Sequence, residues 1–290
     1  MEKGKIIVVL LVLVGILTAA LAAFAPVERL RGTEVAVIPV RGTIGPQSME
    51  ASPEVIQDRI GEARKEGAEG FLFQINSPGG TVVASSQLEK VISDVEEFTV
   101  CQFQDYATSG AYWASSACDR IVADPLTMTG GIGVTSSYLE YSELMEEYGV
   151  EYVRLAEGDL KDMGSPYRNL TEKEREIFQN MLDGVHSKFI ETVAENRNIT
   201  DENIKGMSRG QIILGEEAKE YGLVDQLGGR KEAKEIFKNL LNEDVTLNEY
   251  RETVGLIDIL LGAEGEMETA QEKVIKATEA DFPKLYALAG

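Results

Sequence analysis

The sequence predicts an α/β protein in which parallel strands alternate with crossover helices. Short apolar, β-branched runs at residues 34–40, 71–75 and 99–106 are typical of buried strands. Helical patterns separate these runs, and this alternation favours a parallel sheet with right-handed crossovers. In such folds the functional residues gather beyond the carboxyl ends of the strands. We therefore expect a site in the loops that follow these runs.

Local signals set the helix boundaries. The first helix begins at Pro53 behind the N-cap Ser52 and stops at Gly67. A long helix is expected over 171–196, because Thr171 and Glu174 have the spacing of a capping box. The remaining expected elements are strands at 120–123, 151–155 and 211–214, and helices at about 82–97, from 109 onward, and at 137–148, 216–221 and 230–241.

The N-terminal region carries a long apolar run. Residues 6–25, IIVVLLVLVGILTAALAAFA, contain no charge and are long enough to cross a bilayer as a helix. Lys3 and Lys5 precede the run, so residues 1–5 are expected to be cytoplasmic and the bulk of the chain extracytoplasmic. A cleaved signal peptide is the alternative, because TAALAAFA offers small residues for processing, but the length favours an uncleaved single-pass anchor. Residues 26–33 then form a linker.

Composition excludes some classes of function. The net charge of −21 at pH 7 argues against nucleic-acid binding, which requires a basic face. One histidine and two cysteines leave little for a zinc site, and no metal or cofactor is expected. Cys101 and Cys118 lie in apolar stretches and are expected to be two buried thiols rather than part of a disulfide framework.

Ser109 stands where the third strand passes into a helix, in the stretch DYATSGAYWASSACD (residues 105–119). The first turn of a helix offers free N–H groups and the positive end of the dipole, which favour a negative charge. Ser109 could therefore be a nucleophile, or it could be only an N-cap. Gly110 follows it, and Gly80 lies in the loop after the preceding strand. Both can bring a backbone N–H close to a substrate, although Gly80 could equally serve only a tight turn.

A serine nucleophile needs a group that takes its proton. The single histidine, His186, falls within the long helix and has no acidic partner that would make a triad, so we expect a helix-flank residue. Lys161 lies in an irregular segment between Gly158 and Gly164. A lysine can act as the base when its surroundings favour the neutral amine; the alternative is an ordinary surface lysine.

Four motifs together resemble the signal peptide peptidase A family. They are INSPGG at 75–80, the Ser109 stretch, TGGIG at 129–133 and GDLKDMGSPYR at 158–168. Members are serine–lysine endopeptidases that share the crotonase-like fold with the Clp protease subunit, and the resemblance covers about residues 35–241. It implies that Ser109 is the nucleophile, Lys161 the general base, and Gly80 an oxyanion-hole donor together with Gly110. A Clp subunit would carry a histidine near 130–137, and this chain has none there.

The resemblance also implies a short, single-domain form of the family. The peptidase domain is expected over 34–242, outside the cytoplasm, with an extension at 243–290 that is expected to be partly mobile. The resemblance implies a ring-shaped homo-oligomer as well, and for the short form it implies that the serine and the lysine of one active site come from neighbouring subunits. The expected activity is hydrolysis of hydrophobic peptides such as cleaved signal peptides. Two alternatives remain, a non-proteolytic membrane scaffold and an acyl-CoA enzyme of the same fold.

Overall fold

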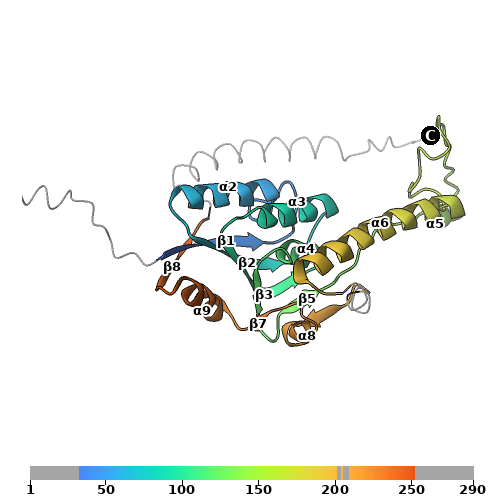
Figure 1. The fold of residues 1–290 in the computed structure, drawn as a ribbon. Coiled ribbons are helices and arrows are strands. Elements are labelled where there is room, and N and C mark those ends of the chain that lie inside the picture. Colours follow the sequence, from blue (N-terminus) through green and yellow to red (C-terminus); the bar gives the residue numbers. More distant parts are fainter. Residues whose placement is uncertain (1–32, 201–203, 205–208, 252–290) are drawn as a thin grey trace, which may run out of the picture. The chain divides into compact units, whose positions relative to one another are not determined.

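Eight strands form one mostly parallel sheet in the computed structural model, which describes residues 33–200, 204 and 209–251 (Figure 1). The strands are β1 (Thr33–Arg41), β2 (Gly70–Ser77), β3 (Phe98–Thr108), β4 (Arg120–Ala123), β5 (Met128–Gly130), β6 (Ile212–Leu214), β7 (Gln226–Leu227) and β8 (Val245–Glu249). Their order is β6-β5-β3-β2-β1-β8, and β4 pairs with both β3 and β7. Every pair is parallel except β5 with β6. The predicted α/β class is confirmed.

The helices follow the predicted pattern closely in the first half of the chain. They are α2 (Pro53–Lys65), α3 (Val82–Ser93), α4 (Gly110–Ser115), α5 (Ser142–Glu147), α6 (Glu172–Arg197), α8 (Gly215–Glu220) and α9 (Arg230–Leu241). The Ser52 hydroxyl accepts a hydrogen bond from Val55 N at 3.2 Å, as an N-cap should. The expected capping box of Thr171 and Glu174 opens α6.

Helices lie on both sides of the sheet. Figure 1 shows α2 and α3 on one side and α9 on the other. Phe237 of α9 is fully buried in a cluster with valines and a leucine of the central strands, and its ring meets that of Phe98 edge to face at 5.9 Å. The sheet is thus covered on both faces, as its nearly continuous apolar strands require. Its carboxyl edge remains available for a site.

The structure departs from the sequence prediction at several elements, including the short strands β5 and β7, which were not predicted. Residues 151–155 were expected to be a strand, but they have no regular structure, and Leu155 is 93% exposed. The helix expected at 137–148 is shortened to α5. Strand β8 was not predicted; it forms because Val245–Glu249 pairs with β1, opposite Thr33. Strand formation needs a partner strand, which a local pattern cannot supply.

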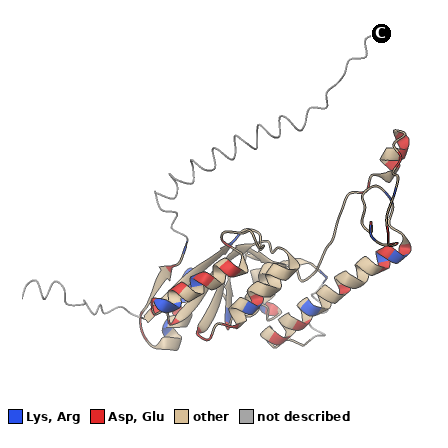
Figure 2. Ribbon diagram, turned by 90° about the horizontal axis from the view of Figure 1, so that it is seen from above, with Lys and Arg blue, Asp and Glu red and all other residues tan. Residues whose placement is uncertain are grey.

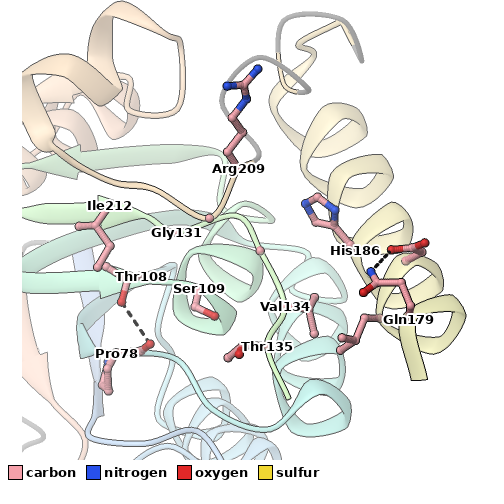
Figure 3. A pocket seen from close by; sticks show the side chains of 14 residues that line it. Pro78, Thr108, Ser109, Gly131, Val134, Thr135, Gln179, His186, Arg209 and Ile212 are labelled. Carbon is pink, nitrogen blue, oxygen red and sulfur yellow. Dashed lines mark hydrogen bonds between the residues drawn. The ribbon is translucent and has the colours of Figure 1, made fainter. Parts of the chain in front are cut away.

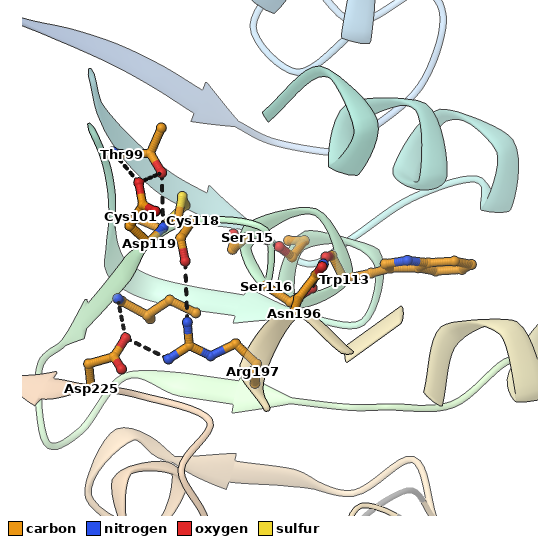
Figure 4. Close-up of a disulfide and its surroundings, with 12 residues drawn as sticks. Thr99, Cys101, Trp113, Ser115, Ser116, Cys118, Asp119, Asn196, Arg197 and Asp225 are labelled. Atoms are coloured by element: carbon orange, nitrogen blue, oxygen red, sulfur yellow. Dashed lines mark hydrogen bonds and ion pairs between the residues drawn. A yellow bond between two sulfur atoms is a disulfide. The ribbon is translucent and has the colours of Figure 1, made fainter. Parts of the chain in front are cut away.

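The two cysteines correct another expectation. Cys101 in β3 and Cys118 after α4 form a disulfide, with their Cα atoms 5.8 Å apart (Figure 4). Both side chains are buried, as predicted, but they are not free thiols. The chain reverses direction between β3 and α4, which brings the two cysteines together. Because they are 17 residues apart in sequence, no local pattern predicts this contact. The disulfide closes a loop that contains Ser109.

The predicted membrane anchor at 6–25 lies outside the described residues, as does most of the expected C-terminal extension. Across 33–200, 204 and 209–251, no helix combines the length and the apolar character needed to cross a bilayer.

Candidate active site

Ser109 has an unusual backbone conformation between β3 and α4, with φ 54° and ψ −126°. Two other described non-glycine residues have positive φ, Asn198 and Asn242, and both are ordinary left-handed helix C-caps. Holding a serine in such a region costs about 1–3 kcal/mol and is frequent at functional sites. Hydrogen bonds from Ser109 N to Gly130 O (2.8 Å) and from Trp113 N to Ser109 O (2.9 Å) fix it there.

The hydroxyl of Ser109 does not cap α4, because it makes no side-chain hydrogen bond to the N–H groups of the helix. Ser109 thus occupies the N-cap position without capping the helix through its side chain. A strained turn from a strand into a helix, whose apex carries a hydroxyl with no hydrogen-bond partner in the described parts of the chain, has the geometry of a nucleophile elbow.

Two glycines approach each other beside Ser109. A Cβ atom added to Gly110 would lie 3.3 Å from the backbone N of Gly80 and 2.0 Å from Ser85 Oγ. A Cβ on Gly80 would lie 1.8 Å from the carbonyl oxygen of Ile44, so this position admits only glycine. Neither N–H donates a hydrogen bond within the described residues. Two unbonded donors next to a serine can hold an oxyanion.

Neighbouring segments fix the Gly80 loop. Ile44 N donates to Gly79 O at 2.9 Å, and Thr81 N donates to Ile44 O at 3.0 Å, so the loop is pinned on both sides of Gly80. Gly79 has φ 98°, and a Cβ on it would lie 3.0 Å from Ser109 Cβ. Close approach, rather than turn formation alone, thus accounts for Gly80, while Gly79 supplies the positive φ that the turn needs.

Ser109 opens into a cavity of about 770 Å³ between the carboxyl edge of the sheet and α6. Figure 3 shows Ser109 near Thr108 and Gly131, with His186 and Gln179 on the helix opposite. The polar side chains that α6 adds to this cavity were not predicted from the sequence. Gln179, Asp183 and His186 recur at helical spacing, and this signal could have found them once the inward side of α6 was known.

His186 lies in the Ser109 cavity rather than at a site remote from it. Its Nε2 atom is buried and has no hydrogen-bond partner among the described residues. Asp183 is one turn away, but its carboxylate accepts from Gln179 Nε2 at 2.7 Å. No hydrogen bond joins His186 to Ser109 or to Asp183 within the described parts of the chain, so these side chains do not form a triad.

A second, smaller cavity of about 120 Å³ adjoins Ser109 and has large apolar side chains on part of its wall. Val82, Trp113, Val185 and Phe189 line it, and the Trp113 and Phe189 rings stack with centroids 4.6 Å apart. It shares lining residues with an apolar groove of about 590 Å³ between α3 and α6. Apolar side chains of a bound molecule could therefore lie along a continuous surface that starts at the serine.

Lys161 is not brought to Ser109 within one chain. It lies on the arm, by which we mean residues 134–171. The arm starts at the Ser109 cavity, which Val134 and Thr135 line, and then reaches away from the sheet; it includes the acidic helix α5 (Figure 2). Lys161 lines neither of the two cavities that contain Ser109. Its side chain is exposed, and its amino group has no hydrogen-bond or ion-pair partner in the parts of the chain that the structure describes.

The flanking glycines shape the Lys161 loop. Gly158 and Gly164 have φ 92° and 82°, so both hold conformations that favour glycine. Lys161 N donates to Gly158 O at 3.2 Å, and Met163 N donates to Leu160 O at 3.1 Å. The segment predicted as irregular is thus a series of tight turns.

A serine on a strained strand-to-helix turn, beside two unbonded backbone N–H groups, is the arrangement of enzymes that use a serine nucleophile. Comparison with known proteins gives the family. A family model described as peptidase family S49 matches residues 99–244, about half of the chain, including both Ser109 and Lys161. The chain belongs to this family, and the resemblance to signal peptide peptidase A is confirmed.

Three relatives illustrate the match. The chain is 34% identical over 217 residues to an Enterococcus faecium protein named as a candidate signal peptide peptidase SppA, covering 73% of this chain and 62% of that protein. It is 32% identical over 209 residues to a candidate protease of Synechocystis, covering 70% of this chain and 76% of that protein. It is 29% identical over 245 residues to the chloroplastic serine protease SPPA of Arabidopsis thaliana, covering 79% of this chain and 36% of that protein. The chain thus spans about six tenths of the Enterococcus relative's length.

Proposed function

We propose that this protein is a membrane-anchored serine endopeptidase that hydrolyses hydrophobic peptides, cleaved signal peptides in particular, through a dyad of Ser109 and Lys161. The observation that carries the proposal is the strained backbone of Ser109 beside the free N–H groups of Gly80 and Gly110. Membership of a peptidase family and the names of the relatives support it. No metal or cofactor is required.

The reaction proceeds through an acyl-enzyme. The neutral amine of Lys161 takes the hydroxyl proton of Ser109, and Oγ attacks the scissile carbonyl carbon. The carbonyl electron pair moves onto oxygen, where the Gly80 and Gly110 N–H groups stabilise it. The C–N bond then breaks as the Lys161 ammonium protonates the leaving amine. Lys161 next deprotonates a water molecule that attacks the ester, and the second peptide leaves as the proton returns to Ser109.

Lys161 reaches Ser109 from a neighbouring subunit of a homo-oligomeric ring. Support comes from the arm, on which Lys161 is exposed and the apolar side chains Leu139, Val153 and Leu155 are exposed as well. Exposed apolar side chains on one segment favour burial against a partner.

The location and the substrate class are inferred from several features. The apolar run at 6–25 provides the single-pass anchor, with the peptidase domain outside the cytoplasm. The Cys101–Cys118 disulfide supports an oxidising, extracytoplasmic compartment. The apolar side chains that line the smaller cavity and the groove favour substrates with apolar side chains, as signal peptides have.

The test is hydrolysis of a fluorogenic apolar peptide by the full chain in detergent micelles. Ser109→Ala and Lys161→Ala should each abolish turnover, and a mixture of the two variants should regain activity, since one supplies Ser109 and the other Lys161. Full activity in Lys161→Ala would refute the dyad. Turnover of an acyl-CoA thioester would favour that alternative, and an intact ring that turns over neither substrate would favour the scaffold.

A further inference from the structure

The loop that carries Lys161 is tied to the start of α6 by a network of ion pairs. Arg168 donates to both carboxylate oxygens of Asp162, through Nε at 2.8 Å and Nη2 at 3.0 Å. The same guanidinium donates to both oxygens of Glu174, at 2.9 Å and 2.5 Å. Arg154 adds a further ion pair to Asp162 at 2.8 Å. One arginine thus joins the residue next to Lys161 to the first turn of the helix.

This network is more than a set of exposed surface pairs. The side chains of Asp162, Arg168 and Glu174 are 14%, 24% and 2% exposed. Bidentate pairs between arginine and carboxylates also fix orientation, which single contacts do not. Hydrogen bonding from Arg168 holds the pKa values of Asp162 and Glu174 well below their usual range, so both carboxylates are charged at neutral pH.

Both ends of the network are anchored. Glu174 accepts hydrogen bonds from Thr171 N and Thr171 Oγ1 at 2.8 and 2.9 Å, so its carboxylate is fixed in the capping box of α6. At the other end, Ser165 N donates to Asp162 O at 2.9 Å, which closes a turn directly after Lys161. A Cβ on Gly164 would lie 3.2 Å from Cζ of Phe178, so the loop also packs closely on α6.

We propose that Arg168 and Asp162 are positioning residues for Lys161. They hold its loop rigidly against α6, so that the amine is presented to the neighbouring subunit's Ser109 from a fixed point. The inference rests on the proposed function, because it needs Lys161 to be the base. Reactions of this kind are sensitive to placement, and a shift of about 1 Å can cost a factor of about a hundred in rate.

The test compares two variants of the network, Arg168→Gln and Asp162→Asn, with two control variants. The controls, Arg175→Gln and Glu176→Gln, each remove an exposed charge from α6. In the full chain, the first two should lower kcat by about tenfold to a hundredfold with KM within about twofold. Their ring sizes should match those of the two controls, and thermal unfolding should show all four variants folded at the assay temperature, although loss of the ion pairs lowers the midpoints of the first two. Wild-type kcat in both Arg168→Gln and Asp162→Asn would overturn the proposal.

Subunit mixing separates positioning of Lys161 from damage to the whole subunit. Arg168→Gln keeps its own Ser109, and Ser109→Ala keeps an intact arm, so their mixture should regain as much activity as Lys161→Ala mixed with Ser109→Ala. Failure of the first mixture alone would show that Arg168 acts on more than the lysine loop, against the proposal. An active Lys161→Ala variant would instead remove the dyad, and the positioning role with it.

Discussion

Substitution of Gly80 by alanine tests the oxyanion site directly. The added Cβ would lie 1.8 Å from the carbonyl oxygen of Ile44, whereas Cβ atoms essentially never come closer than 3.0 Å to a non-bonded heavy atom of another residue. The loop must therefore move by about 1.2 Å, the difference between these distances, and its hydrogen bonds to Ile44 prevent a small local adjustment. A donor displaced that far no longer points at an oxyanion held by Gly110.

The expected loss follows from what one oxyanion donor contributes. Removal of such a donor lowers kcat by about a hundredfold to a thousandfold, which corresponds to about 3–4 kcal/mol of transition-state stabilisation. KM should change little, because the ground-state carbonyl gains less from the donor than the oxyanion does. The assay is steady-state hydrolysis of the fluorogenic peptide, with kcat and KM determined separately.

Gly45→Ala is the matched control. It lies in the same region of chain as Ile44, and a Cβ there would meet nothing within 4 Å, so wild-type kinetics are expected. Thermal unfolding of both variants checks that the fold persists. If Gly80→Ala is folded and keeps kcat within about threefold of wild type, the assignment of its N–H to the oxyanion hole is refuted.

Three further predictions concern stability. Phe237→Ala removes a fully buried ring from the core and should lower the free energy of unfolding by about 3–5 kcal/mol, measured by urea denaturation. Replacing both Cys101 and Cys118 by serine removes a cross-link between residues 17 positions apart and should lower the free energy of unfolding by about 3 kcal/mol. An unchanged midpoint of urea denaturation would contradict the disulfide. Hydrogen bonds from Arg168 first, and then from Thr171, lower the pKa of Glu174 from 4.5 to about 2. The stabilisation from that carboxylate is therefore complete above about pH 4.5 and disappears as the pH falls through about 2, so Glu174→Gln and wild type should converge in stability over that interval.

Local sequence patterns determined much of the fold. Runs of apolar β-branched residues predict burial on both faces of a strand, and they placed β1, β2 and β3 correctly to within a few residues. The starts of α2 and α6 were also predictable from local sequence. The N-cap side chain and the backbone N–H that it accepts from lie within one helical turn of each other in both helices, and a proline follows the cap in α2. The junction of strand and helix at Ser109 was predicted in this way too.

Pairing between distant segments was beyond those patterns. Strand β8 exists because β1 offers it a partner, and residues 151–155, with a similar apolar composition, have no such partner among the described residues and stay irregular. The disulfide and the place of His186 beside Ser109 likewise depend on how the chain returns upon itself.

For the candidate site, the sequence by itself supplied the residues: a serine at a helix start, two glycines, and a lysine between glycines. Only the tertiary structure decided that the hydroxyl of Ser109 does not cap α4, because its backbone angles depend on contacts with Gly130 and with the Gly79–Gly80 loop. It also decided that Gly80 and Gly110 are neighbours and that Lys161 is elsewhere on the same chain. Residue types limit the possible chemistry, but distances between atoms far apart in sequence are set by packing, and these distances decide which groups can react together.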